Sequence, residues 1–209
     1  MEDFNRLFNL LELTRSMPQS GYALLGLPKD QLSDLAQHQY LVAMIAWQLA
    51  RGANRAGANL NVEKVLELAL VHDLGELFGG DIAMPYGHAN KKAKKLAKAF
   101  EEENLKYLSK FFGDDKKYVA KIFEEIKEHK TDEGIVAKLA DYIECSHYRL
   151  YMNAVDKNDQ EFNLEKINGF LKKMKDPAAK KYLSECVESW HKNFFKTQGR
   201  TNIMRSFWE

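Results

Sequence analysis

Apolar side chains recur at helical spacing along most of the chain. Between residues 35 and 49 they form a broad stripe, and Ser33 or Asp34 is a suitable N-cap for the helix that this stripe predicts. A second stripe runs over residues 62–70, and Asn61 can cap its helix. Both helices bury one face, so we expect them to form part of the core.

The remaining amphipathic segments complete an all-helical pattern. The helix that starts after Asn61 is expected to end near Gly75, and further helices are predicted over 91–112, 118–129, 133–152, 162–173 and 178–195. Pro177 suits a first helical turn. Loops are expected at 17–33 and 79–90, with a polar connection at 153–160. Strand-like alternation is scarce, and no internal repeat is visible. The pattern predicts an all-α, single-domain helical bundle over residues 1–209, with C-terminal helices in 161–209.

Composition narrows the classes of function. Lys and Arg total 31 against 30 Asp and Glu, a net charge of +1, which argues against a nucleic-acid-binding arm or a polybasic membrane anchor. The N-terminus lacks a signal-peptide pattern, and no run approaches the roughly 18 apolar residues of a membrane helix. Cys145 and Cys186 form no CxxC pair and suit small core residues of a reducing compartment. We therefore expect a soluble, cytoplasmic protein with no nucleic-acid or membrane partner.

Candidate chemistry begins at His72-Asp73, which closes a strongly apolar run. Burying such a pair is costly unless a partner compensates it, and a divalent metal would do so. His38 and Asp141 lie in two other predicted helices, and the apolar pattern predicts that both positions face inward. Any one of these residues has an ordinary alternative as a capped or paired core polar group, whereas the four together favour one metal site.

The ordered set resembles the HD superfamily of metal-dependent phosphohydrolases. The stretch His72-Asp-Leu-Gly-Glu-Leu-Phe-Gly-Gly-Asp81 is similar to the His-Asp-x-x-Glu-x-x-x-Gly-Asp segment of the bacterial and archaeal 5′-deoxynucleotidase branch. The segments Ala36-Gln-His38 and Lys138-Leu-Ala-Asp141 also match. The resemblance covers roughly residues 10–155, the motif-bearing core.

The resemblance implies a role for each matching residue. His38, His72, Asp73 and Asp141 match the metal ligands, which implies one divalent ion. Ligands of nitrogen and oxygen suit Mn, Co, Fe, Ni or Zn. Glu76 matches a residue used for proton transfer, with a solvent-facing glutamate as the alternative. Asp81 matches a family residue that lies near the metal-bound water and the substrate sugar. It could equally be a helix cap or a turn aspartate.

Phosphate recognition is where the chain departs from that branch. The branch has Arg-Trp-Pro, whereas this chain has Arg15-Ser16-Met17-Pro18, so Arg15 matches the phosphate-binding arginine only after a one-residue slip. A plain surface arginine is the alternative. Gln37, just before His38, is a second departure, because members of the family commonly have a glutamate at this position. These differences leave the choice between ribose and deoxyribose open.

Other polar residues suggest less specific roles. His88 and His129 fall where phosphodiesterase members add ligands for a second metal, but their surroundings favour surface or capping roles. The lysine-rich run 91–98 suits a solvated helix face, with a surface that attracts nucleotides as the alternative. Family members are commonly homodimers, which the resemblance extends to this chain, and the aromatic segment 190–208 could supply contacts.

The hypothesis that follows is divalent-metal-dependent hydrolysis of a phosphomonoester, with a (deoxy)nucleoside 5′-monophosphate as the expected substrate. Hydrolysis of a nucleoside triphosphate or a cyclic dinucleotide by another kind of HD enzyme is one alternative. A non-catalytic, metal-stabilised helical interaction module is the other. Glu76 and Asp81 speak against the module, because purely structural metal binding requires neither.

Overall fold

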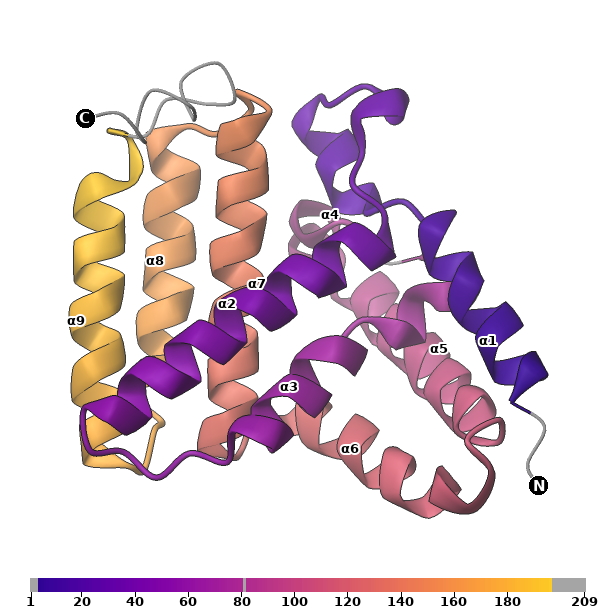
Figure 1. Cartoon of the computed structure of the whole chain (residues 1–209). Coiled ribbons are helices and arrows are strands. Elements are labelled where there is room, and N and C mark those ends of the chain that lie inside the picture. The colour runs from indigo at the N-terminus through magenta and orange to yellow at the C-terminus, as the bar shows by residue number, and fades with distance from the viewer. Residues whose placement is uncertain (1–3, 81, 197–209) are drawn as a thin grey trace. The chain divides into compact units, whose positions relative to one another are not determined.

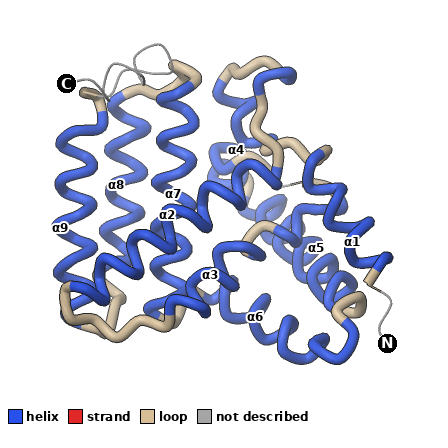
Figure 2. Tube along the Cα trace, viewed as in Figure 1, coloured by secondary structure: helices blue, strands red, loops and turns tan. Residues whose placement is uncertain are grey.

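The computed structural model describes residues 4–80 and 82–196, and over these residues the chain is helical (Figures 1 and 2). The α-helices are α1 (Asn5–Glu12), α2 (Leu35–Arg55), α3 (Val62–Val71), α4 (Met84–Ala89), α5 (Lys91–Ser109), α6 (Lys116–Glu128), α7 (Asp132–Tyr151), α8 (Lys157–Leu171) and α9 (Pro177–Phe194). Short 3₁₀ helices include η1 (Leu13–Arg15), η2 (Ser20–Leu25), η3 (Lys29–Gln31), η4 (Leu74–Phe78) and η5 (Gly113–Asp115). Within the described ranges, strand-like pairing is limited to one isolated antiparallel bridge between Pro18 and Asp34. The all-α prediction is confirmed.

The chain divides into two compact units. The first comprises Met1–Tyr40 and Leu70–Lys127, and the second comprises Leu41–Ala69 and Glu128–Glu209. The prediction of a single domain over 1–209 stays a prediction. None of the helices in the described part is long and apolar enough to cross a membrane.

In the first unit, η4 packs against α5. Leu74 and Leu77 of η4 are buried with Leu105 and Leu108 of α5 and with Phe123 of α6. These five apolar side chains remove the short 3₁₀ helix from water and fix it on a longer, regular helix.

A buried hydrogen bond reinforces this packing. The Asn104 side-chain amide donates to the Gly75 carbonyl oxygen at 2.7 Å. This bond satisfies an amide on the buried side of α5, where an unmade hydrogen bond would be costly. The segment that follows His72-Asp73 is therefore fixed by both apolar and polar contacts.

In the second unit, α7, α8 and α9 lie side by side (Figure 1). Ile167 of α8 and Leu183 of α9 are fully buried, as is Leu139 of α7. Asp176 caps α9 by accepting from the backbone N–H groups of Ala178 and Ala179. The unit thus presents α7, which carries Asp141, as a regular and well-packed helix.

Two predicted helix beginnings are confirmed, whereas other boundaries differ from the expectation. Asp34 and Asn61 accept from backbone N–H groups three residues on, as expected of N-caps. The expectation that the second helix continues to Gly75 is wrong, because α3 ends at Val71 and a turn and η4 follow. The loop expected at 79–90 contains α4, and α8 begins at Lys157, inside the expected polar connection.

The two cysteines are a further correction. Cys145 and Cys186 are half-buried free thiols, so neither is a fully enclosed core residue. Cys145 has a polar partner on its own helix, which a small apolar core residue would not need.

We predict that Gly75→Ala destabilises the protein. A Cβ at Gly75 would lie 2.4 Å from Glu101 Cγ and 3.1 Å from Leu105 Cγ, so η4 would have to move off α5. Overpacking of this kind costs about 1–3 kcal/mol, measurable as a lower midpoint of urea unfolding. Gly169→Ala in α8 is the matched control, because nothing lies within 4 Å of its added Cβ. An unchanged midpoint for Gly75→Ala would contradict the predicted close packing.

Candidate metal centre

His38 is placed by the start of α2. The chain before this helix pairs with an earlier segment: the Leu35 N–H donates to the Met17 carbonyl, and the Gln19 N–H donates to the Ser33 carbonyl. Asp34 then caps the helix by accepting from the Gln37 N–H at 2.8 Å. His38 follows in the first turn and is only 1% exposed. Its position is therefore fixed by both a cap and a pairing.

His72 and Asp73 are placed by the end of α3. The helix stops at Val71, and Asp73 has φ −110° and ψ 12°, a conformation that leaves the α-helical path. The Glu76 N–H donates to the Asp73 carbonyl at 3.0 Å, which starts the 3₁₀ turn of η4. This change of helix type turns both side chains of the pair toward His38.

Three side-chain atoms converge in the first unit. The Nε2 atoms of His38 and His72 are 3.1 Å apart, and Asp73 Oδ2 lies 3.3 Å from each of them. His72 is buried like His38, whereas the Asp73 side chain is 19% exposed. The three atoms form a nearly equilateral triangle, and these residues together could hold a metal ion.

The electrostatics of the triangle keep the carboxylate ionised. Burial raises the pKa of Asp73, but the charge of His72 and hydrogen bonds from both imidazoles outweigh it, so this pKa lies well below its usual value. Asp73 therefore carries a full negative charge at neutral pH in a largely enclosed position. A cation at the triangle would neutralise that charge.

The geometry of the donor set fits a divalent ion. Adjacent ligand atoms around an ion with bonds of about 2.1 Å are about 3.0–3.4 Å apart, the range of the three separations observed here. Two imidazole nitrogens and a carboxylate oxygen are also the ligand types that such ions take in hydrolytic sites.

Gln19 completes this cluster and was missed by the sequence patterns. Its side-chain amide donates to Asp73 Oδ2 at 3.2 Å. A carboxylate oxygen has two lone pairs, so it can accept this bond and still bind a cation. Gln19 lies 54 residues from Asp73 in a segment without periodicity, so the sequence offered no signal for the contact.

The other predicted residues of the first unit differ in their placement. Glu76 is half-buried in η4, one 3₁₀ turn after Asp73. Asp81 lies outside the described residues. The Arg15 side chain is 72% exposed and forms an ion pair with Glu12 at 2.8 Å, whereas Met17 packs against the apolar cluster under η4.

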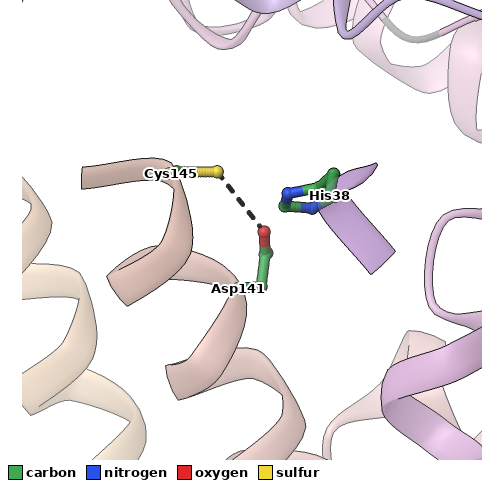
Figure 3. A group of neighbouring side chains, drawn as sticks. All are labelled: His38, Asp141 and Cys145. Atoms are coloured by element: carbon green, nitrogen blue, oxygen red, sulfur yellow. Dashed lines mark hydrogen bonds between the residues drawn. The ribbon is translucent and has the colours of Figure 1, made fainter. Parts of the chain in front are cut away.

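Asp141 belongs to the second unit. It is buried on α7, where the Cys145 thiol donates to its Oδ1 at 3.5 Å (Figure 3). The Lys138 ammonium donates to its Oδ2 at 2.5 Å. Both partners come from neighbouring turns of the same helix, so the carboxylate is held by a local arrangement.

The remaining histidines have separate environments. His88 is exposed on α4, and the ring centroids of His129 and Phe170 are 5.5 Å apart in a T-shaped arrangement. Neither belongs to a cluster of metal-binding side chains within the described part of the chain. His147 accepts from the Trp190 indole N–H at 2.8 Å, and the described part of the aromatic segment 190–208 ends at residue 196.

Known proteins resemble this chain in sequence. A model of the HD domain matches residues 25–183. A 5′-deoxynucleotidase from Photorhabdus laumondii is 28% identical over 136 residues, which cover 63% of this chain and 66% of that protein. A 5′-deoxynucleotidase from Vibrio parahaemolyticus is 29% identical over 164 residues, or 75% of this chain and 81% of that protein.

Solved structures share the fold. A conserved hypothetical protein from Pyrococcus furiosus has a TM-score of 0.64 and 26% identity, and the match covers 88% of this chain and 96% of that one. An HD-domain phosphohydrolase from Listeria innocua has a TM-score of 0.66 and 22% identity, covering 86% and 85%. The family match spans most of the chain and includes His38, the His72-Asp73 pair and Asp141. This chain therefore belongs to the HD-domain family of phosphohydrolases.

Proposed function

We propose that the protein is a metal-dependent phosphomonoesterase that hydrolyses (deoxy)nucleoside 5′-monophosphates to the nucleoside and phosphate. The observation that carries the proposal is the triangle of His38, His72 and Asp73 with Glu76 one turn beyond it. The 5′-deoxynucleotidase names of the Photorhabdus and Vibrio relatives support this substrate class.

In this proposal, one divalent ion is held by His38, His72 and Asp73, with Asp141 as the fourth ligand. The bound ion supplies Lewis acidity, which neutralises phosphate charge and favours deprotonation of water. The ligand types suit Mn, Co, Fe, Ni or Zn. The two carboxylates would balance the two positive charges of the ion.

The protein's own groups then position the reactants and move the proton. Glu76 takes the proton from the attacking water and can return it to the leaving 5′-oxygen, since a half-buried carboxylate serves as both base and acid. Asp81 is proposed to orient the water or the sugar. Arg15 is proposed to bind phosphate, which requires it to leave Glu12.

The placement of Glu76 also separates this function from one alternative, the non-catalytic metal module. A structural metal module needs the three ligands of the triangle but no half-buried carboxylate on the next turn. Nucleoside triphosphate or cyclic-dinucleotide hydrolysis would use the same ligands, so these reactions are distinguished by substrate rather than by the triangle.

The test of the proposal is phosphate release from a panel of substrates. The panel contains ribo- and deoxyribonucleoside mono-, di- and triphosphates and a cyclic dinucleotide, each assayed with every candidate metal. We expect release of inorganic phosphate from 5′-monophosphates above all others. Metal-loaded protein that is active on none of the panel would contradict the proposed function.

We predict that Glu76→Gln lowers kcat by about 10²–10⁴-fold, the usual contribution of a general acid–base group. Metal affinity, measured by calorimetry, should stay within a few-fold of the wild type, because Glu76 is not a proposed ligand. Glu63→Gln, an exposed glutamate in the first turn of α3, is the matched control and should retain full activity. Full turnover by Glu76→Gln would remove Glu76 from the proton-transfer step.

We also predict that Gln19→Leu weakens metal binding about 10–100-fold, the usual effect of losing a hydrogen bond to a metal ligand. The substitution preserves side-chain size but removes the donor that orients Asp73 Oδ2. Titration calorimetry with Mn²⁺ measures the effect, and Gln37→Leu, an exposed glutamine beside His38, is the control. Equal Mn²⁺ affinity in wild type and Gln19→Leu would show that Asp73 is oriented without this bond.

A further inference from the structure

Lys138 is held against Asp141 in the second unit. The two residues are three positions apart on α7, and Lys138 Nζ lies 2.5 Å from Asp141 Oδ2. The ammonium also lies 5.2 Å from the ring centre of Tyr142, a cation–π distance. Contacts on the same helix thus confine the ammonium to the neighbourhood of this carboxylate.

Lys138 is nevertheless open to a ligand from solvent. Its side chain is 27% exposed, whereas that of Asp141 is 12% exposed. A partly exposed ammonium on a flexible four-carbon stem can exchange one anion for another without a change in the helix. An ammonium has three N–H donors, so it can bind more than one acceptor at a time.

Metal binding at Asp141 would change what Lys138 neutralises. The proposed function places a divalent cation on the same carboxylate, so two cations would then compete for one anion. Their mutual repulsion drives the more mobile one, the ammonium, toward another negative group. The substrate of a phosphomonoesterase brings that group in the form of a dianionic phosphate.

We propose that Lys138 is a substrate-binding residue whose ammonium exchanges Asp141 in the metal-free protein for a phosphate oxygen of a bound phosphomonoester. The inference rests on the proposed function, specifically on Asp141 as a metal ligand. Lys138 lies one helical turn from Asp141, so its ammonium is close to the metal site whenever Asp141 binds the metal. Arg15, the phosphate-binding candidate from the sequence, is by comparison mostly exposed, as is its partner Glu12.

The experiment measures binding of inorganic phosphate to the full-length, Mn²⁺-loaded protein by titration calorimetry. For Lys138→Met we expect the Kd for phosphate to rise about tenfold or more, the loss of a charge-assisted hydrogen bond. Lys138→Arg should retain most of the affinity, because it keeps the charge. Lys130→Met is the matched control, since that lysine is 72% exposed and pairs with Glu128.

Metal affinity separates this role from a structural one. Lys138→Met should bind Mn²⁺ as tightly as the wild type or more tightly, because a competing cation is removed. A lysine that only supports Asp141 would instead lose Mn²⁺ affinity and leave the phosphate Kd of the loaded protein unchanged. That pair of results would overturn the proposal, as would a metal-loaded wild type that binds no phosphate. Lys138→Gln replaces Lys138→Met if the methionine variant does not fold.

The experiments distinguish failure of the proposed function from failure of the proposed role of Lys138. If phosphate binding depends on Lys138 but no substrate of the panel is hydrolysed, the inference about Lys138 stands and the phosphatase function is wrong. If 5′-monophosphates are hydrolysed and Lys138→Met leaves both the phosphate Kd and KM unchanged, the function stands and Lys138 is not a substrate ligand.

Discussion

The enclosed negative charge of Asp73 is the constraint on which the described site depends. Asp73 Oδ2 lies 3.3 Å from each of two imidazole nitrogens, and these neighbours favour the ionised carboxylate and lower the pKa of Asp73. Burying such a charge is costly unless its neighbours compensate it. The Gln19 amide supplies one donor to the same oxygen, and a divalent cation bound by the two imidazoles would place positive charge beside it. The near-neutral total charge of the chain is therefore compatible with phosphate chemistry, because the positive charge of the site comes from the ion.

The ligands of the triangle are brought together because regular helices begin or end next to them. If α3 continued regularly beyond Val71, His72 and Asp73 would follow the α-helical rotation and could not both face His38. The turn and η4 redirect them, and η4 is fixed on α5 because Gly75 has no Cβ to collide with Glu101. The pairing of Met17 and Gln19 with the chain before α2 similarly links the position of Gln19 to that of His38. The same contacts therefore stabilise the fold and determine the positions of the metal-binding side chains.

Sequence patterns predicted local features well and non-local ones poorly. Asp34 and Asn61 were recognised as caps, and Asp176 precedes Pro177, which was recognised as a first-turn residue. Such features are visible in the sequence because a cap bonds to backbone groups only two or three residues away. The early end of α3 was not predictable, since it depends on packing against α5, which lies far along the chain. Gln19 escaped notice for the same reason. The residue types His and Asp at positions expected to face inward pointed to His38, His72 and Asp73, whose side-chain atoms the structure brings together. Their role as metal ligands stays a prediction, and so does that of Asp141. Asp81 lies outside the described residues, and its role stays a prediction as well.

Binding of a divalent ion by the triangle is the property from which the proposed chemistry follows. A crystal of the full-length protein grown with Mn²⁺ tests it directly, through an anomalous difference map recorded above the manganese edge. We expect one strong peak about 2.1 Å from His38 Nε2, His72 Nε2 and Asp73 Oδ2. A map without a peak at these atoms, or with Mn²⁺ held only by other residues, would show that the triangle is not a metal site.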